Sequence, residues 1–117
     1  MEEFKIKEKI YEMILYGSPA LLQFPKAEKF LLANDIRRSM YTVLRLVIMV
    51  ENKSYKKTTL QELDTELDIL RNLVRLAADK KLYPGQIPCL AFKKYENWSK
   101  LLNEIGRMIG GYMKSVK

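Results

Sequence analysis

The sequence contains no histidine and only one cysteine, Cys89. This scarcity excludes disulfide bonds within the chain, zinc sites built from cysteine and histidine, and Ser-His or Cys-His nucleophilic pairs. An imidazole general base is also excluded, and with it most hydrolytic mechanisms. We therefore expect a protein without enzymatic activity, cofactor or metal. Cys89, which follows Pro88, is interpreted as a small buried or loop residue.

Long apolar runs are missing as well. No stretch approaches the ~20 apolar residues that span a bilayer, and the first residues, MEEFKIKEKIY, lack the apolar stretch of a signal peptide. We expect a cytoplasmic protein that makes no contact with a membrane. A chain of 117 residues suits a single domain.

Acidic residues are fewer than basic ones. Twenty-one Lys and Arg against fourteen Asp and Glu give a net charge of +7 and a pI near 9.5. Such an excess favours an anionic partner, most simply a nucleic acid.

Glycine and proline, the residues that interrupt helices, are concentrated in two short regions, 17–25 and 83–88. The remaining stretches show apolar residues at helical spacing and no strand alternation. The sequence therefore predicts one all-α domain, an oligomeric up-down four-helix bundle. Its helices are expected at about 4–16, 26–51, 56–81 and 92–115.

Apolar positions define the buried side of each expected helix. The third helix is the most regular, because its apolar residues are spaced by three and four in alternation. The apolar residues, from the first helix to the fourth, are Ile10, Met13, Ile14 and Gly17; Leu32, Ile36, Val43, Val47 and Val50, with Leu44 and Ile48 beside them; Leu60, Leu63, Leu67, Leu70, Val74 and Ala77; and Trp98, Leu102, Ile105, Ile109 and Tyr112.

Helix ends carry weaker signals. Ser18 and Pro19 are expected to restart or kink the first helix, because they resemble an N-cap and first-turn pair. Thr59 and Glu62 have the spacing of a capping box for the third helix, although Ser54 offers an earlier start.

Basic residues recur every seven positions in the fourth helix, at Lys93, Lys100, Arg107 and Lys114. On a straight helix they form a column about 30 Å long, which matches the run of a phosphate backbone. The alternative is a solvated face, since Glu96 and Glu104 lie within one turn of these bases.

Two further basic groups lie on the second and third helices. Arg37, Arg38 and Arg45 accompany Tyr41, whose ring is suited to stacking on a base or a guanidinium, although a surface stripe with a snorkelling tyrosine is the favoured interpretation of Tyr41. On the third helix the group is Arg71 and Arg75.

An ion pair with Asp68 would explain Arg71 structurally, and Arg75 has less acidic company. The carboxylate pairs Glu62/Glu66 and Asp64/Asp68 have a spacing that suits a hard cation or a shared proton. Without histidine or a second acidic helix we do not assign them such a role.

Glycines interrupt the apolar pattern of the fourth helix. Each glycine within a helix costs about 1 kcal/mol relative to alanine, so Gly106, Gly110 and Gly111 need an explanation. Gly106 and Gly110 form a G-x-x-x-G step, which would let another helix or another subunit approach closely. A glycine C-cap is the alternative. Because Tyr112 and Met113 keep the apolar phase, we expect the helix to continue.

Three segments resemble a known family. "FPKAEKF" at 24–30, "LDILRNLVRLA" at 67–77 and "YENWSKLLNEIGRMIGGYMKS" at 95–115 are similar to the accessory variability determinant (Avd) of diversity-generating retroelements. The resemblance covers nearly the whole chain, and the ending is its most specific part. A looser resemblance extends to four-helix proteins encoded in ribosomal-RNA intervening sequences, which share the "FPK" segment.

The resemblance implies a four-helix bundle that assembles as a ring-like homopentamer, partners the reverse transcriptase of the retroelement and binds RNA or DNA during mutagenic retrohoming. It implies no catalysis by the protein itself. Arg71, Arg75 and Arg107 belong to the family pattern, and Lys114 is its basic ending. The chain departs from the pattern at Tyr112, where many relatives have tryptophan, and at Ile109, where leucine is usual.

Three alternatives remain open on the sequence alone. The first is a stand-alone RNA-binding protein of the intervening-sequence type. The second is a small metal-dependent nuclease that uses the acids of the third helix. The third is a pure oligomerisation adaptor that binds no nucleic acid.

Overall fold

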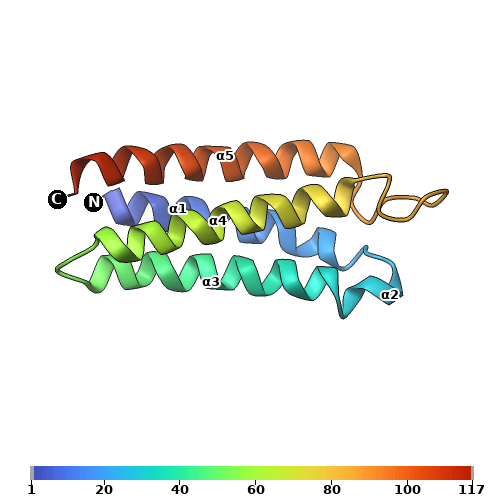
Figure 1. Ribbon diagram of the computed structural model, residues 1–117, viewed down its shortest axis with the longest axis horizontal. Helices are drawn as coiled ribbons and strands as arrows, with labels where there is room; N and C mark the ends of the chain where they lie inside the picture. Colours follow the sequence, from blue (N-terminus) through green and yellow to red (C-terminus); the bar gives the residue numbers. More distant parts are fainter. Residues whose placement is uncertain (1, 117) are drawn as a thin grey trace.

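Four long helices lie side by side in the computed structural model, which describes residues 2–116 (Figure 1). They are α1 (Glu2–Leu21), α3 (Leu32–Asn52), α4 (Lys57–Ala78) and α5 (Phe92–Ser115), and the short α2 (Lys26–Lys29) precedes α3. Both α1 and α4 pack against α3 and α5, so α3 and α5 occupy diagonal positions. The predicted all-α, up-down four-helix architecture is confirmed. In the described range no helix combines the length and apolar composition that crossing a membrane requires.

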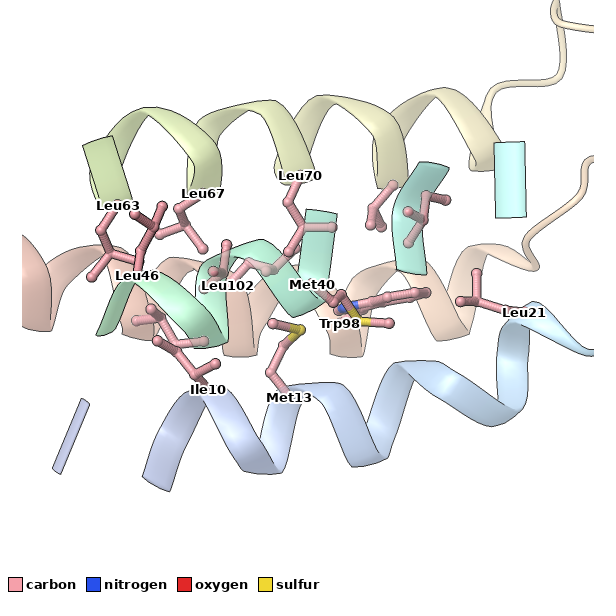
Figure 2. Close-up of a cluster of buried hydrophobic side chains, with 14 of the residues drawn as sticks. Ile10, Met13, Leu21, Met40, Leu46, Leu63, Leu67, Leu70, Trp98 and Leu102 are labelled. Atoms are coloured by element: carbon pink, nitrogen blue, oxygen red, sulfur yellow. The ribbon is translucent and has the colours of Figure 1, made fainter. Parts of the chain in front are cut away.

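The core runs along the axis of the bundle, which measures 50 × 22 × 20 Å. The seam of apolar residues that the sequence predicts for the third helix, from Leu60 to Ala77, is buried throughout. Trp98 is the largest fully buried side chain and lies in the middle of this core (Figure 2). Burial of one large apolar side chain stabilises the fold by about 1.5–3 kcal/mol. Because the alternating spacing places the apolar residues on one side of α4, their burial holds that side against the neighbouring helices.

The first helix is longer than predicted. α1 continues to Leu21 with Pro19 inside it, so the restart or kink expected at Ser18 and Pro19 is wrong. Pro19 lies in the last turn, where its missing N–H removes at most one helical hydrogen bond. Ala20 and Leu21 are buried, and their packing keeps the chain helical past the proline.

The second predicted helix is interrupted. The chain forms α2, turns at Phe30 and Leu31, and begins α3 at Leu32. The side chain of Leu31 makes no capping hydrogen bond. Instead, the carboxylate of the buried Glu28 accepts a hydrogen bond from the Leu32 N–H, with a donor–acceptor distance of 3.4 Å. This cap is local, since its two residues are four positions apart, but the sequence interpretation did not include it.

The ends of α4 also differ from the prediction. Neither the expected capping box nor a start at Ser54 is present, because α4 begins at Lys57 with no side-chain cap. The Thr59 hydroxyl accepts a hydrogen bond from Lys53 Nζ at 2.9 Å. At the other end α4 stops at Ala78, short of residue 81, and the Leu90 N–H donates to the Ala77 carbonyl at 2.9 Å. The loop thus folds back onto the helix end.

Candidate nucleic-acid and partner interface

The basic column of the fourth predicted helix lies on the outer face of α5. Lys93, Lys100, Arg107 and Lys114 are all exposed, and α5 runs along the length of the bundle (Figure 1). Lys93 Nζ lies 3.9 Å from a Glu96 carboxylate oxygen. Within residues 2–116 the other three bases form no ion pair with a protein carboxylate.

Glu104, the second acid expected to neutralise this column, is directed elsewhere. Its carboxylate lies 3.5 Å from Lys9 Nζ of α1. Lys7 Nζ of α1 similarly lies 3.0 Å from the Glu51 carboxylate of α3. Cations of α1 are therefore used in contacts between helices, whereas the cations of the α5 column remain directed to solvent.

The basic group of α3 occupies a different side of the molecule. Arg38 and Arg45 are exposed, Arg37 is half-buried, and Tyr41 is also exposed. Because α3 and α5 are diagonal in the bundle, the structure does not bring this group together with the α5 column. The protein thus has two separate basic surfaces.

Arg71 and Arg75 of α4 face the groove toward α5. Arg71 is half-buried, and its Nη2 donates a hydrogen bond to the Leu102 carbonyl at 3.3 Å. The expected ion pair with Asp68 is absent from the ion pairs of the described residues. That prediction is wrong because the guanidinium reaches across to α5 instead of turning back along its own helix.

Gly106 permits this crossing. A Cβ placed on Gly106 would overlap the Arg71 guanidinium, so the missing side chain opens the path from α4 to the Leu102 carbonyl. Gly110 and Gly111 differ, because nothing lies within 4 Å of the position that a Cβ would take at either residue. Within one chain, therefore, only the first of these three glycines is closely approached. Contact between the other two and another subunit stays a prediction.

Gly17 is a further glycine at a close contact between helices, and the interpretation of Gly106, Gly110 and Gly111 did not include it. A Cβ on Gly17 of α1 would overlap the indole ring of Trp98 on α5. Gly17 is predicted on the buried face of its helix, beside Ile10 and Met13, and that placement is confirmed. A glycine at a core position of the apolar pattern was the sequence feature that could have indicated this close packing.

A hollow with a volume of about 240 Å³ lies between α4 and α5. We call it the α4–α5 hollow, and its lining residues are Arg71, Asn72, Arg75, Tyr95, Ser99 and Asn103. The sequence interpretation identified the two arginines but missed the α5 residues. Tyr95, Ser99 and Asn103 are spaced by four, so the sequence places them on one face of the helix, and this spacing could have identified them.

An apolar stripe on the outside of α1 was also missed. Phe4, Tyr11 and Leu15 are exposed, with 62% of the Leu15 surface accessible, and Leu22 just beyond α1 is exposed as well. Phe4, Tyr11 and Leu15 line a second hollow of about 580 Å³ together with Met108 of α5. We call Phe4, Tyr11 and Leu15 the α1 stripe. Their spacing of seven and four on the face opposite the core was its signal.

The ends of α1 and α5 are joined by a polar contact. A hydrogen bond from Tyr112 and the nearby Lys56 ammonium lower the pKa of Glu3. Burial and the bond to Glu3 raise the pKa of Tyr112 to about 12. Lys56 Nζ lies 3.5 Å from a Glu3 carboxylate oxygen. The pKa shifts thus link Tyr112, near the end of α5, with Glu3, near the start of α1.

The acids of α4 and the cysteine are explained structurally. Glu66 accepts a hydrogen bond from the Ser39 hydroxyl at 2.6 Å, whereas Glu62, Asp64 and Asp68 are exposed. Among the described residues no three His, Cys, Asp or Glu side chains are grouped to hold a metal ion. Cys89 is buried, and burial together with the nearby Glu28 charge raises the pKa of its thiol.

Comparison with known proteins gives one family. The model of a family described as bAvd-like matches residues 4–116. No curated protein matches the chain with significant similarity.

Proposed function

The chain belongs to the bacterial Avd family, and on that premise we propose that it binds RNA or DNA and the reverse transcriptase of its retroelement through its basic surfaces. Membership makes it an accessory protein of a diversity-generating retroelement, and the family is non-catalytic. The proposed role is support of mutagenic retrohoming by holding template, product strand and enzyme together.

The observation that carries the proposal is the exposed column on α5. Lys100, Arg107 and Lys114 are exposed and form no ion pair with a carboxylate of residues 2–116. Glu104 is turned toward Lys9 of α1, and Glu2 lines the same hollow as Arg107. A cation that is not neutralised within its own protein attracts phosphates and releases their counterions. Because the contacts are to the backbone, binding is expected to be largely independent of base sequence.

The second basic surface is available to another partner at the same time. Arg37, Arg38 and Arg45 lie on α3, diagonal to α5, so a molecule on one surface does not occlude the other. Arg71 and Arg75 extend the positive area of α5 toward α4. This arrangement suits a scaffold that contacts nucleic acid and the reverse transcriptase together.

Self-association completes the proposal, with a second copy of this chain covering the α1 stripe. Exposed apolar residues in a continuous patch mark an interaction surface. The stripe is bordered by charges of both signs, Lys5, Glu8, Lys9 and Glu12, and such a mixed border can pair with charges of either sign on another copy. Contact between unlike faces gives a ring when the rotation between copies closes and a filament when it does not, and the homopentamer that the family resemblance implies is the closed case. Repeated basic surfaces in one ring add their weak phosphate contacts.

Electrophoretic mobility shifts with RNA, DNA and an RNA–DNA hybrid test the nucleic-acid role. We expect binding at about 50 mM salt that weakens by roughly a factor of a thousand at about 200 mM, as expected for several phosphate contacts. Arg107→Glu together with Lys100→Glu is expected to abolish the shift. Lys26→Glu together with Lys29→Glu, which changes two exposed bases of α2 and lowers the net charge by the same amount, is the control for net charge. Unimpaired binding by the double variant would contradict the proposal.

Co-purification with the reverse transcriptase encoded beside it tests the second partner. The tagged chain is expected to retain the enzyme after nuclease treatment, which removes any bridging nucleic acid. Arg38→Glu with Arg45→Glu is expected to weaken retention while leaving the chain folded, because both residues are exposed. Loss of the enzyme on nuclease treatment alone would show that the two proteins meet only through nucleic acid.

A further inference from the structure

The α4–α5 hollow has a composition suited to an anion. Its lining contains two guanidinium groups, Arg71 and Arg75, together with amide and hydroxyl groups from Asn72, Ser99 and Asn103. None of the residues that line it is acidic. Arg71 and Arg75 are four positions apart on α4, so their side chains project from the same face one turn apart.

Arg71 is held in place but incompletely bonded. Its Nη2 donates to the Leu102 carbonyl, which fixes the orientation of the planar group. Its Nε is buried and has no hydrogen-bond partner in the described structure. A buried N–H of a charged group without an acceptor is costly, and such groups are normally paired. Because this Nε is closed to solvent, an acceptor bound in the hollow removes the cost only when the guanidinium moves outward.

An aromatic pair lies beside the same hollow. Tyr95 lines it, and the ring of Phe92 lies 6.1 Å from the Tyr95 ring, centroid to centroid, with an interplanar angle of 47°. Phe92 has 68% of its surface exposed. Nucleic-acid proteins use exposed aromatic rings to stack unpaired bases, and Phe92 is such a ring.

We propose that the α4–α5 hollow binds one phosphodiester group of single-stranded RNA or DNA between Arg71 and Arg75, with the adjacent base stacked on Phe92. The proposal rests on the nucleic-acid binding proposed above and adds a defined site and a preference for unpaired strands. A duplex presents its phosphates but keeps its bases stacked internally, so it can use the arginines without the ring. A phosphate group offers several oxygens and can accept from both guanidinium groups at once.

The first test follows the side-chain Nε–H signal of Arg71 by NMR in the whole protein. Inorganic phosphate at millimolar concentration is expected to shift this signal, and a short oligo-uridine is expected to shift it at much lower concentration. Arg71→Lys removes the signal and assigns it. The exposed Arg45 on α3 serves as the internal reference for a nonspecific response. A shift of Arg71 with acidic peptide but not with phosphate would overturn the proposal and indicate a protein-docking site.

The second test compares single-stranded and duplex oligonucleotides of equal length at equal salt. Phe92→Ala is expected to weaken single-strand binding roughly tenfold, the size of one lost stacking contact. Duplex binding is expected to change by less than about twofold. Arg75→Ala is expected to weaken both, and Lys26→Ala, at an exposed base of α2 outside the proposed surfaces, is the control that leaves the single-strand-to-duplex ratio unchanged. Circular dichroism confirms that each variant is folded.

The outcomes separate this inference from the proposed function. Equal losses for single strand and duplex in Phe92→Ala, or an unmoved Arg71 signal while oligonucleotide still binds, would overturn the hollow as the site and leave nucleic-acid binding standing. Complete indifference of the wild-type protein to every nucleic acid would overturn both.

Discussion

At the scale of single residues, two glycines show how the same amino acid serves different purposes. Gly17 faces the Trp98 ring, whereas Gly111 faces open space. The indole is rigid and fully buried, so it cannot yield to an added methyl group. The same substitution at the two sites therefore has opposite expected effects.

Gly17→Ala is expected to lower the free energy of unfolding by about 1–3 kcal/mol, the usual effect of overpacking a core. Gly111→Ala is expected to raise it by up to about 1 kcal/mol, because alanine is the better helix former and meets no neighbour. Urea denaturation of the two variants and the wild type measures both. A stabilised Gly17→Ala variant would contradict the packing described for Trp98.

Tyr112 supplies a prediction about pH. Burial and the hydrogen bond to Glu3 raise its pKa to about 12 from an ordinary value of 10.0, so the folded state favours the protonated phenol. The stabilisation is fully present below pH 10.0 and is lost as the pH rises toward about 12. The difference in ultraviolet phenolate absorbance between wild type and Tyr112→Phe is expected to rise near pH 12 and not near pH 10.0.

The lowered pKa of Glu3 makes the stability of the fold depend on acidic pH, because the folded state loses stability as the pH falls. Its carboxylate favours the folded state above the ordinary value of 4.5, and this contribution is lost as the pH falls through the lower folded value. In Tyr112→Phe the largest cause of the shift is removed. The Glu3 pKa, followed by NMR, is therefore expected to rise toward 4.5 in that variant; an unchanged value would show that the contact does not form.

At the scale of helices, the sequence predicted what depends on periodicity. The buried positions of α4 and α5 follow directly from apolar spacing, because burial rewards every third or fourth residue in the same way along a helix. α5 runs from Phe92 to Ser115 through its glycines, as the unbroken apolar phase indicated. The burial of apolar residues that recur at a fixed spacing was therefore predicted well from the sequence.

Helix ends and side-chain directions were predicted poorly, because they depend on partners far along the chain. Pro19 stays helical because Ala20 and Leu21 are buried by the rest of the bundle. Arg71 passes over Gly106 to Leu102 on another helix, a contact that no local pattern specifies. The apolar stripe of α1 was visible as spacing, but only the fold shows that it is outside the core.

Substitutions at Glu28 test the local cap between α2 and α3, in which the Glu28 carboxylate accepts from the Leu32 N–H. Glu28→Ala removes the acceptor for the Leu32 N–H and is expected to destabilise the protein by about 1–2 kcal/mol, as loss of a cap does. Glu28→Gln retains a carbonyl acceptor of the same length and is the matched control. Amide hydrogen exchange of Leu32 is expected to accelerate in the alanine variant only. Unchanged exchange in Glu28→Ala would show that solvent caps α3.

At the scale of the whole molecule, charge and apolar surface are separated. The basic column lies on α5, a second basic group lies on the diagonal helix α3, and the α1 stripe lies on the helix between them. A second copy seated on the stripe would leave most of the α5 column free. Assembly and nucleic-acid binding are therefore separable by mutation.

Tyr11→Glu together with Leu15→Glu is the variant that separates them. Because both side chains are exposed in the single chain, the helices are expected to remain folded while added charge on the stripe prevents association. Light scattering is expected to show a multiple of the 13.8 kDa chain for the wild type and one chain for the variant. Leu76→Glu, at an exposed apolar position on α4, is the matched control and is expected to keep the assembled mass. The dissociated variant should still bind oligonucleotide, but more weakly, because the contacts of several copies no longer add. A wild-type mass of one chain at micromolar concentration, or an assembly that survives both charges, would show that the stripe does not join copies of this protein.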